Sequence, residues 1–132
     1  MKIKTLTIVA VASILFSACS KENDATPGST DDRDRFTGSW ICTEAGNPSS
    51  FTITITKRGA ADTIRIENFA GYGTNEPQAW ALISGNSMTI PFQSITQTSI
   101  NIKGTGVLNT AGTKITMNYI ADIDTIAAIC LP

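Results

Sequence analysis

Three cysteines, Cys19, Cys42 and Cys130, are the residues of this chain with the widest range of chemistry. A thiol can act as a nucleophile, bind a metal, pair in a disulfide or carry a lipid. The first two uses are disfavoured because the chain contains no histidine. Histidine is the usual base beside a catalytic thiol and a common companion of thiolates around zinc. We therefore predict no metal site and interpret the cysteines through modification and crosslinking.

Two carboxylates and two glycine clusters are the remaining candidates for catalysis. Asp122 and Asp124 could in principle act as acid and base, but such a pair more often flanks a solvated turn, and Ca²⁺ prefers six or more oxygen ligands. The glycines of residues 71–73 and 104–106 are not followed by the helix start that a phosphate-binding loop requires. We therefore predict that the protein is not an enzyme and uses no cofactor.

The first eighteen residues have the pattern of a secretory signal peptide. Lys2 and Lys4 precede an uncharged apolar run over residues 6–18. This run is shorter than the roughly 20 apolar residues of a membrane-spanning helix. A cationic start, a short apolar stretch and small residues at its end are typical of a signal peptide. We predict that residues 1–18 direct export and are then removed.

The residues that end at Cys19 resemble the lipobox of bacterial lipoproteins. The sequence Phe16-Ser17-Ala18-Cys19 places small residues before a cysteine that, in that family, is acylated on sulfur and becomes the new N-terminus. The resemblance implies that Cys19 carries the lipid that attaches the protein to a membrane. Stable anchoring takes more than one acyl chain, and the three chains implied by the resemblance would satisfy this requirement. An ordinary signal peptide cut after Ala18 or later is the alternative.

A polar segment over residues 20–35 follows Cys19. It mixes acidic and basic residues and has no aliphatic residue larger than Ala25, so it cannot bury enough apolar surface to fold. We expect a flexible tether over residues 19–35. Its start, residues 20–24, resembles the export signal of Bacteroidota-type lipoproteins, which implies an outer-membrane protein exposed on the cell surface. A periplasm-facing location is the alternative.

Cys42 and Cys130 are left as an even pair in an oxidising compartment. A disulfide between them is the natural interpretation, and closing so long a loop would contribute roughly 2–5 kcal/mol. Two unpaired buried cysteines that behave as small hydrophobic residues are the alternative. The charge is nearly balanced, with 10 basic and 11 acidic residues, and no basic stripe is present. Nucleic acid is therefore not an expected partner.

Residues 36–132 are predicted to form one all-β domain. Apolar and polar residues alternate with a period of two, as in Phe51, Ile53 and Ile55, which is typical of strands. No stretch has the apolar spacing and caps of a helix. The predicted strands cover residues 38–44, 50–57, 62–68, 78–84, 87–92, 98–108, 113–120 and 124–131. Gly104 and Gly106 fall on the inner face of one of them, where glycine lets a strand bend sharply or permits close packing.

A disulfide from the first strand to the last would place those two strands side by side or across a thin core from each other. Closure of the sheet removes its exposed edges, so we predict an antiparallel up-and-down barrel of about eight strands, with an open β-sandwich as the alternative. The interior is expected to be filled by apolar side chains. The expected core residues are Trp40, Phe51, Ile53, Ile55, Ile64, Ile66, Trp80, Leu82, Ile90, Phe92, Ile102, Met117 and Tyr119.

The start of this domain resembles lipocalin-like (calycin) barrels. Gly38-Ser39-Trp40 is similar to the G-x-W sequence that opens their first strand, in which the tryptophan packs at the closed end. The order of strands is similar to that of small lipocalin-like lipoproteins of the Bacteroidota type. The resemblance implies a closed barrel and, as a function, carriage of a small apolar ligand inside it.

The long loop over residues 68–80 is the expected site for a protein or glycan partner. Phe69, Tyr72 and Trp80 could stack on a sugar or anchor an interface, and glycines give the loop freedom. The alternative is that these rings close one end of the barrel. We therefore expect a non-catalytic, lipid-anchored binding protein of the cell envelope, with carriage of a small apolar ligand as the alternative function.

Two short stretches resemble the acceptor sequence of Bacteroidota-type protein O-glycosylation, which is aspartate, then serine or threonine, then an aliphatic residue. They are Asp62-Thr63-Ile64 and Asp124-Thr125-Ile126. The resemblance implies that Thr63 and Thr125 carry glycans.

Overall fold

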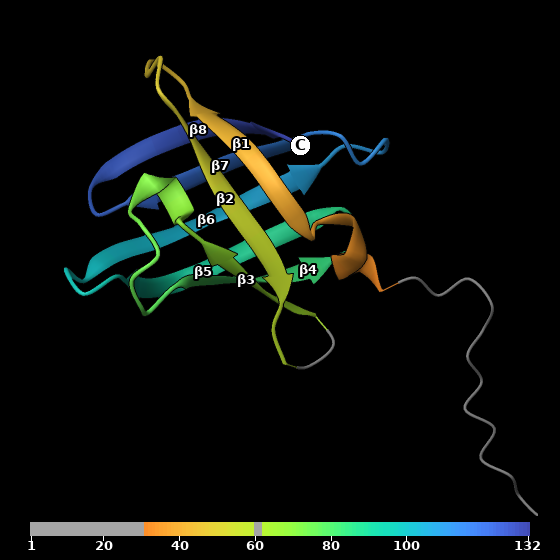
Figure 1. The fold of residues 1–132 in the computed structure, drawn as a ribbon, viewed down its shortest axis with the longest axis horizontal. Helices are drawn as coiled ribbons and strands as arrows, with labels where there is room; N and C mark the ends of the chain where they lie inside the picture. Colours follow the sequence, from red (N-terminus) through yellow and green to blue (C-terminus); the bar gives the residue numbers. More distant parts are fainter. Residues whose placement is uncertain (1–30, 60–61) are drawn as a thin grey trace, which may run out of the picture.

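A computed structural model of the chain describes residues 31–59 and 62–132. Eight antiparallel strands form a closed barrel in which each strand pairs with its neighbours in sequence and the last pairs with the first (Figure 1). The strands are β1 (Gly38–Glu44), β2 (Ser50–Lys57), β3 (Thr63–Glu67), β4 (Ala79–Ser84), β5 (Ser87–Ile95), β6 (Ile100–Leu108), β7 (Ile115–Ala121) and β8 (Asp124–Leu131). Two short 3-10 helices, η1 (Asp32–Arg35) and η2 (Phe69–Gly71), complete the described chain.

The predicted all-β barrel is confirmed, and the open sandwich is excluded by the pairing of β1 with β8. Strands β1, β2 and β8 have the predicted bounds. The predicted signal peptide, Cys19 and the first part of the tether lie outside the described residues. Within the described ranges, no helix is long and apolar enough to cross a membrane.

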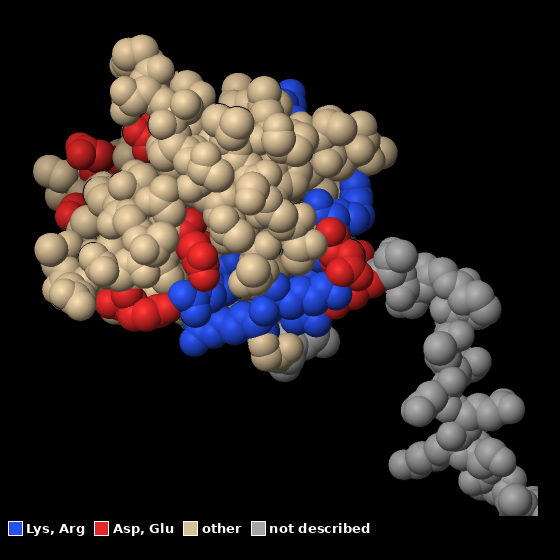
Figure 2. Space-filling model, in the orientation of Figure 1, with Lys and Arg blue, Asp and Glu red and all other residues tan. Residues whose placement is uncertain are grey.

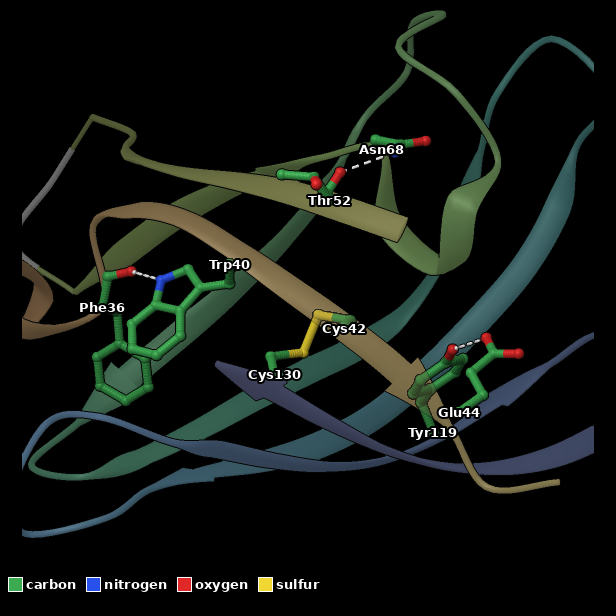
Figure 3. The surroundings of a disulfide bond; sticks show 8 residues. All are labelled: Phe36, Trp40, Cys42, Glu44, Thr52, Asn68, Tyr119 and Cys130. Atoms are coloured by element: carbon green, nitrogen blue, oxygen red, sulfur yellow. Dashed lines mark hydrogen bonds between the residues drawn. A yellow bond between two sulfur atoms is a disulfide. The ribbon is translucent and has the colours of Figure 1, made fainter. Parts of the chain in front are cut away.

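The disulfide prediction is confirmed as well. Cys42 of β1 lies directly opposite Cys130 of β8, and the two buried residues are bonded (Figure 3). Inward positions of the strands alternate with outward ones, so that Ile53 and Ile55 of β2 are buried while Thr52 is exposed. A crosslink on the inner face thus joins the first and last strands of the barrel.

The inward glycines of β6 allow the close packing that was expected of them. A Cβ atom on Gly104 would come within 2.5 Å of the Cβ atom of Tyr119, and one on Gly106 within 2.5 Å of the Cε atom of Met88. At Gly104 the backbone oxygen of Asn118 is also within 2.6 Å, so a larger residue there would force the strands apart, whereas at Gly106 the end of the Met88 side chain would have to move.

Three expected core residues lie on the outer surface instead. On β4 the inward residues are Ala79, Ala81 and Ile83, which leaves Trp80 half-buried on the outside and Leu82 exposed. Both faces of β4 carry apolar residues, so the period-two pattern does not tell which face of the strand points into the barrel. The interior of an eight-stranded barrel has little room, and the small alanines point into it.

Phe92 was predicted to share the inner face with Met88 and Ile90, and it is 72% exposed. The pairing of β5 with β6 is regular as far as Ile90 and resumes at Gln93 with a shifted register. A bulge of this kind changes which residues point inward. As a result Phe92 points outward, and Ile95 is buried further along the strand.

The described chain also differs from the expected tether at its end, because residues 31–35 are ordered. Asp31 caps η1 by accepting the backbone N–H of Arg33 at 3.0 Å. The guanidinium of Arg33 is buried and donates to the backbone oxygen of Thr63 at 3.2 Å. Arg35 donates to the backbone oxygen of Thr110 at 3.1 Å. Hydrogen bonds and ion pairs hold this segment, and a criterion based on apolar burial does not count them.

Candidate functional site

The loop between β3 and β4 is held in place by two amide side chains. The Nδ2 atom of Asn68 donates to the backbone oxygen of Thr52 at 2.8 Å (Figure 3), and its Oδ1 atom accepts the N–H of Gly73 at 2.7 Å. The buried Gln78 accepts the backbone N–H of Asn68 at 3.0 Å and donates to the backbone oxygen of Asn75. The loop is therefore fixed at both ends.

Phe69 closes one end of the barrel. It is buried, and its ring lies edge-on to the ring of Tyr119 with centroids 4.8 Å apart. The hydroxyl of Tyr119 donates to the carboxylate of Glu44 (Figure 3). Burial, together with this bond, raises the pKa of Tyr119 far above its usual range. The phenol is thus a neutral donor, and Phe69 is not available to a partner.

Tyr72 lies at the same end of the barrel and is partly exposed. Its pKa is raised, first by burial and then by the negative charges of Glu44, Asp122 and Asp124. The three aromatic residues predicted to form one site therefore go to three places. Phe69 packs inside the barrel, Tyr72 lies at the barrel end, and Trp80 lies on the outer wall.

Trp80 lines a groove of about 540 Å³ on this outer wall. Across the sheet it faces Arg65 of β3. The groove combines one indole, three basic side chains, one carboxylate and two amides with smaller polar residues. We call it the Trp80 groove, and its lining residues are Thr56, Lys57, Arg58, Gly59, Arg65, Glu76, Pro77, Gln78, Trp80, Gln93 and Ser94.

The groove lies where β4 and β5 separate. Their pairing begins at Ser84 with Ser87 and ends at Leu82 with Thr89, and its continuation would place Pro91 opposite Trp80. Proline has no N–H to donate to a neighbouring strand. The side chain of Gln93 bonds to the backbone of Trp80 in place of a neighbouring strand. Its Oε1 atom accepts the N–H of Trp80 at 2.9 Å, and its Nε2 atom donates to the oxygen of Trp80 at 2.8 Å. A side-chain amide thus replaces the backbone of a strand.

The charges along the groove are unevenly paired. Arg65 forms ion pairs with Glu76 and, at 3.4 Å, with Glu67, yet its Nε atom is buried and has no hydrogen-bond partner among the described residues. Lys57 contacts Asp31 at 3.0 Å and also Asp34, and both carboxylates raise its pKa.

Arg58 is exposed, and no ion pair joins its side chain to the part of the chain that the structure describes. Figure 2 shows basic side chains gathered along the lower edge of the molecule, where Figure 1 places the ends of β2 and β3. Among the basic residues that line the groove, Arg58 is therefore the one whose charge no described carboxylate pairs with.

A second groove, of about 440 Å³, lies on the other side of β5 and is more apolar. It includes Phe92, Gly104 and Ile120, and an adjoining groove of about 370 Å³ shares Phe92 and reaches Ile123, which is 91% exposed. We call this surface the Phe92 groove.

Asp122 lies in the two-residue turn between β7 and β8 and Asp124 begins β8, and both are exposed, as the solvated-turn interpretation expected. Asp122 has a φ of 53° and accepts the backbone N–H of Asn101 at 3.0 Å. Within residues 31–59 and 62–132, no cluster of three or more carboxylate, cysteine or histidine side chains is placed to bind a metal ion.

The two threonines of the glycosylation pattern differ in exposure. Thr63 is half-buried at the start of β3, where its hydroxyl donates to Asp62 at 3.3 Å. Thr125 is exposed on β8, opposite Ile120. Glycosylation at either position stays a prediction.

No known protein family model matches this chain, and no curated protein matches it in sequence. The fold is therefore the feature of this chain that can be compared with other proteins. At the η1 end, Trp40 is buried and its indole N–H donates to the oxygen of Phe36 at 2.8 Å (Figure 3). The resemblance to lipocalins stays a prediction, because an eight-stranded barrel alone is not diagnostic of that family.

The sequence reasoning did not identify Arg58, Arg65 or Gln93 as residues of one site. They come from β2, β3 and β5 or the turns beside them, and only the closure of the sheet brings them together. Pro91 was the usable signal, because a proline inside a strand pattern indicates a break in the ladder.

Proposed function

We propose that this protein is a non-catalytic binding protein of the cell envelope, anchored through a lipid on Cys19, and that its partner binds in the Trp80 groove. The observation that carries the proposal is the outward position of Trp80 among charged and amide side chains. An indole on a protein surface is costly to leave in water and is enriched where partners bind. A small number of polar groups that converge beside an aromatic side chain is typical of a ligand site.

The position of the groove suits a tethered protein. Segment η1 lies against the turns at one end of the barrel, through Asp32 to Gly85 at 2.9 Å and Arg35 to Thr110 at 3.1 Å. The described chain therefore begins at that end. The Trp80 groove runs from Arg58 along the side wall to Glu76 and Ser94, so most of its length lies away from η1.

Carriage of an apolar ligand inside the barrel is the weaker candidate. Large side chains fill the interior, among them Phe36, Phe69, Met88 and Tyr119, each almost fully buried. A ligand there would have to displace packed side chains, which costs free energy.

The anchor is tested by comparing the native chain with Cys19→Ala in a bacterial host that processes lipoproteins. We expect the native protein in the detergent phase of a membrane extract, labelled by radioactive palmitate. Cys19→Ala should be found in the soluble fraction without label. A native chain that is soluble and unlabelled contradicts the anchor.

The binding site is tested with the unlipidated Cys19→Ala chain, carrying a fluorescent label and added to envelopes of the same host. We expect saturable binding that falls about tenfold or more with Trp80→Leu, which removes the indole but keeps an apolar strand residue. Leu82→Ala is the matched control, because Leu82 lies on the same face of β4 outside the groove. Equal loss in both variants, or no saturable binding, contradicts the proposal.

A further inference from the structure

We propose that the ligand of the Trp80 groove is an acidic saccharide, a short chain of sugars that bears carboxylates. This inference rests on the proposed function, because it names the ligand class of the same site. The groove, of about 540 Å³, falls within the range of small-molecule sites, roughly 300–1,000 Å³. It is open along the wall, which suits a chain that continues beyond the bound units.

The indole of Trp80 supplies the surface on which a sugar ring packs. The faces of a pyranose ring carry C–H groups, and an aromatic ring offers them a flat apolar surface while its N–H stays available to a hydroxyl. The N–H and the oxygen of Trp80 are both bonded to the Gln93 amide, at 2.9 Å and 2.8 Å, and β3 pairs with Trp80 on the other side of β4. The platform is thus held before the ligand arrives, which lowers the ordering cost of binding.

The basic residues supply the preference for an acid. Arg58 is exposed without an ion pair to the described residues, so its guanidinium is open to a ligand. Arg65 contributes less, because Glu67 and Glu76 already pair with it and its Nε atom is buried. A carboxylate is the group that guanidinium donors recognise in pairs. Lys57 is less available, because Asp31 and Asp34 already contact it.

Amides and hydroxyls around these charges match the remaining groups of a sugar. Gln78, Gln93, Thr56 and Ser94 line the same groove, and such side chains both donate and accept hydrogen bonds. A free inorganic anion would use the arginines but leave the indole and the amides unused. A nucleic acid is disfavoured by the small number of basic residues and by the net charge of −1.

The experiment uses the unlipidated full chain and follows tryptophan emission. The chain has two tryptophans, and Trp40 is buried at the η1 end, so a change on binding reports Trp80. The probes are the 1,4-linked disaccharides of galacturonate, glucuronate and mannuronate. The neutral disaccharides with the same ring stereochemistry and inorganic phosphate are the comparisons.

We expect at least one uronate disaccharide to change the emission, with a Kd below about 1 mM. The neutral counterpart should bind about tenfold or more weakly, since it lacks the charge-assisted bonds. Arg58→Ala should weaken uronate binding about tenfold, Arg58→Lys should recover part of it, and added salt should weaken it in the native chain. Lys103→Ala is the matched control, because Lys103 is an exposed basic residue that lines the Phe92 groove.

Three results would overturn the inference. They are the absence of binding to all three uronates, equal binding of the neutral disaccharides, and full competition by phosphate at equal affinity. The envelope-binding assay distinguishes failure of this inference from failure of the proposed function. If Trp80→Leu reduces envelope binding while uronates neither bind nor compete, the groove binds another ligand. If neither assay depends on Trp80, both proposals fail.

Discussion

Two seams of the barrel are closed in opposite ways. Between β1 and β8, four residue pairs are in register, and one of them, Cys42 with Cys130, is covalently bonded on the inner face. Between β4 and β5, three pairs are in register, and beyond them the side chain of Gln93 bridges to Trp80. We call these the disulfide seam and the Gln93 seam.

The difference suggests a division between stability and the proposed binding in this barrel. A buried crosslink constrains the unfolded chain and leaves the outer wall regular. A side-chain amide satisfies the same backbone groups, but it allows the strands to separate and opens the Trp80 groove outside. Irregular positions of a sheet are often those that carry function. The disulfide seam is therefore expected to govern stability, and the Gln93 seam to govern binding.

The largest expected effect comes from the disulfide seam. Replacing both cysteines, as Cys42→Ala with Cys130→Ala, should lower the free energy of unfolding by roughly 2–5 kcal/mol, because the crosslink closes a loop with a sequence separation of 88 residues. Urea denaturation measures the change. Ligand binding in the Trp80 groove should persist below the unfolding transition.

Reductant provides the control for this comparison. It should destabilise the native chain by a similar amount and leave the double alanine variant unchanged. A native chain whose urea midpoint is insensitive to reductant would show that the crosslink does not support the fold.

The Gln93 seam should give a smaller loss of stability and a larger loss of binding. Gln93→Leu leaves the N–H and the oxygen of Trp80 without their present partners, at a cost of about 1–3 kcal/mol. It should also weaken envelope binding, since Trp80 loses its support. Gln93→Glu should be intermediate, because a carboxylate can accept from the N–H but cannot donate to the oxygen.

Ser94→Ala is the matched control for the Gln93 seam. Ser94 is exposed and its hydroxyl bonds to the side chain of Asn101 at 2.6 Å, so its removal should change the unfolding free energy by less than about 0.5 kcal/mol. If Gln93→Leu and Ser94→Ala lower the unfolding free energy equally, the Gln93 amide does not hold β4 and β5 together at this seam.

The disulfide seam was predictable from the sequence and the Gln93 seam was not. The alternation of threonine and isoleucine predicted β2 with its observed bounds. Cysteines near the two ends of the domain indicated which strands meet. Both signals are local or depend on two residues only.

The Gln93 seam depends on events that a periodic pattern does not record. The bulge between Ile90 and Gln93 shifts the alternation within one strand, and the apolar faces of β4 leave its orientation undecided until the volume of the interior is known. The groove then requires β2, β3 and β5 to meet. Trp80 was identified as a site residue, but its partners Arg65 and Gln93 depend on tertiary structure.

The N-terminal segment supports the Gln93 seam from its turn, and this support should depend on pH. Asp32 accepts the N–H of Gly85 at 2.9 Å, and the segment is held by Asp31, which bonds to Arg33 at 2.7 Å and contacts Lys57 at 3.0 Å. Hydrogen bonds from Arg33 hold the pKa of Asp31 well below its ordinary value of 3.8.

A lowered carboxyl pKa gives stability that is present above the ordinary value and is lost as the pH falls below it. The melting temperature of the native chain should therefore fall more steeply below about pH 3.8 than that of Asp31→Asn, with a smaller difference at high salt. Asp124→Asn, an exposed acid at the opposite end, should leave the native profile in place. Identical profiles for the native chain and Asp31→Asn would contradict a role for this contact.

The smallest expected effect concerns the bulge between Ile90 and Gln93, which lies in the pairing of β5 with β6 next to the Gln93 seam. Because the bulge turns Phe92 outward, to 72% exposure, Phe92→Ser should change the unfolding free energy by no more than about 0.5 kcal/mol. A phenylalanine inside the barrel would cost about 3–5 kcal/mol on truncation, so urea denaturation separates the two orientations clearly. Uronate and envelope binding should be unchanged, since Phe92 lies outside the Trp80 groove. A large loss of stability would place Phe92 inside the barrel and contradict the bulge between Ile90 and Gln93.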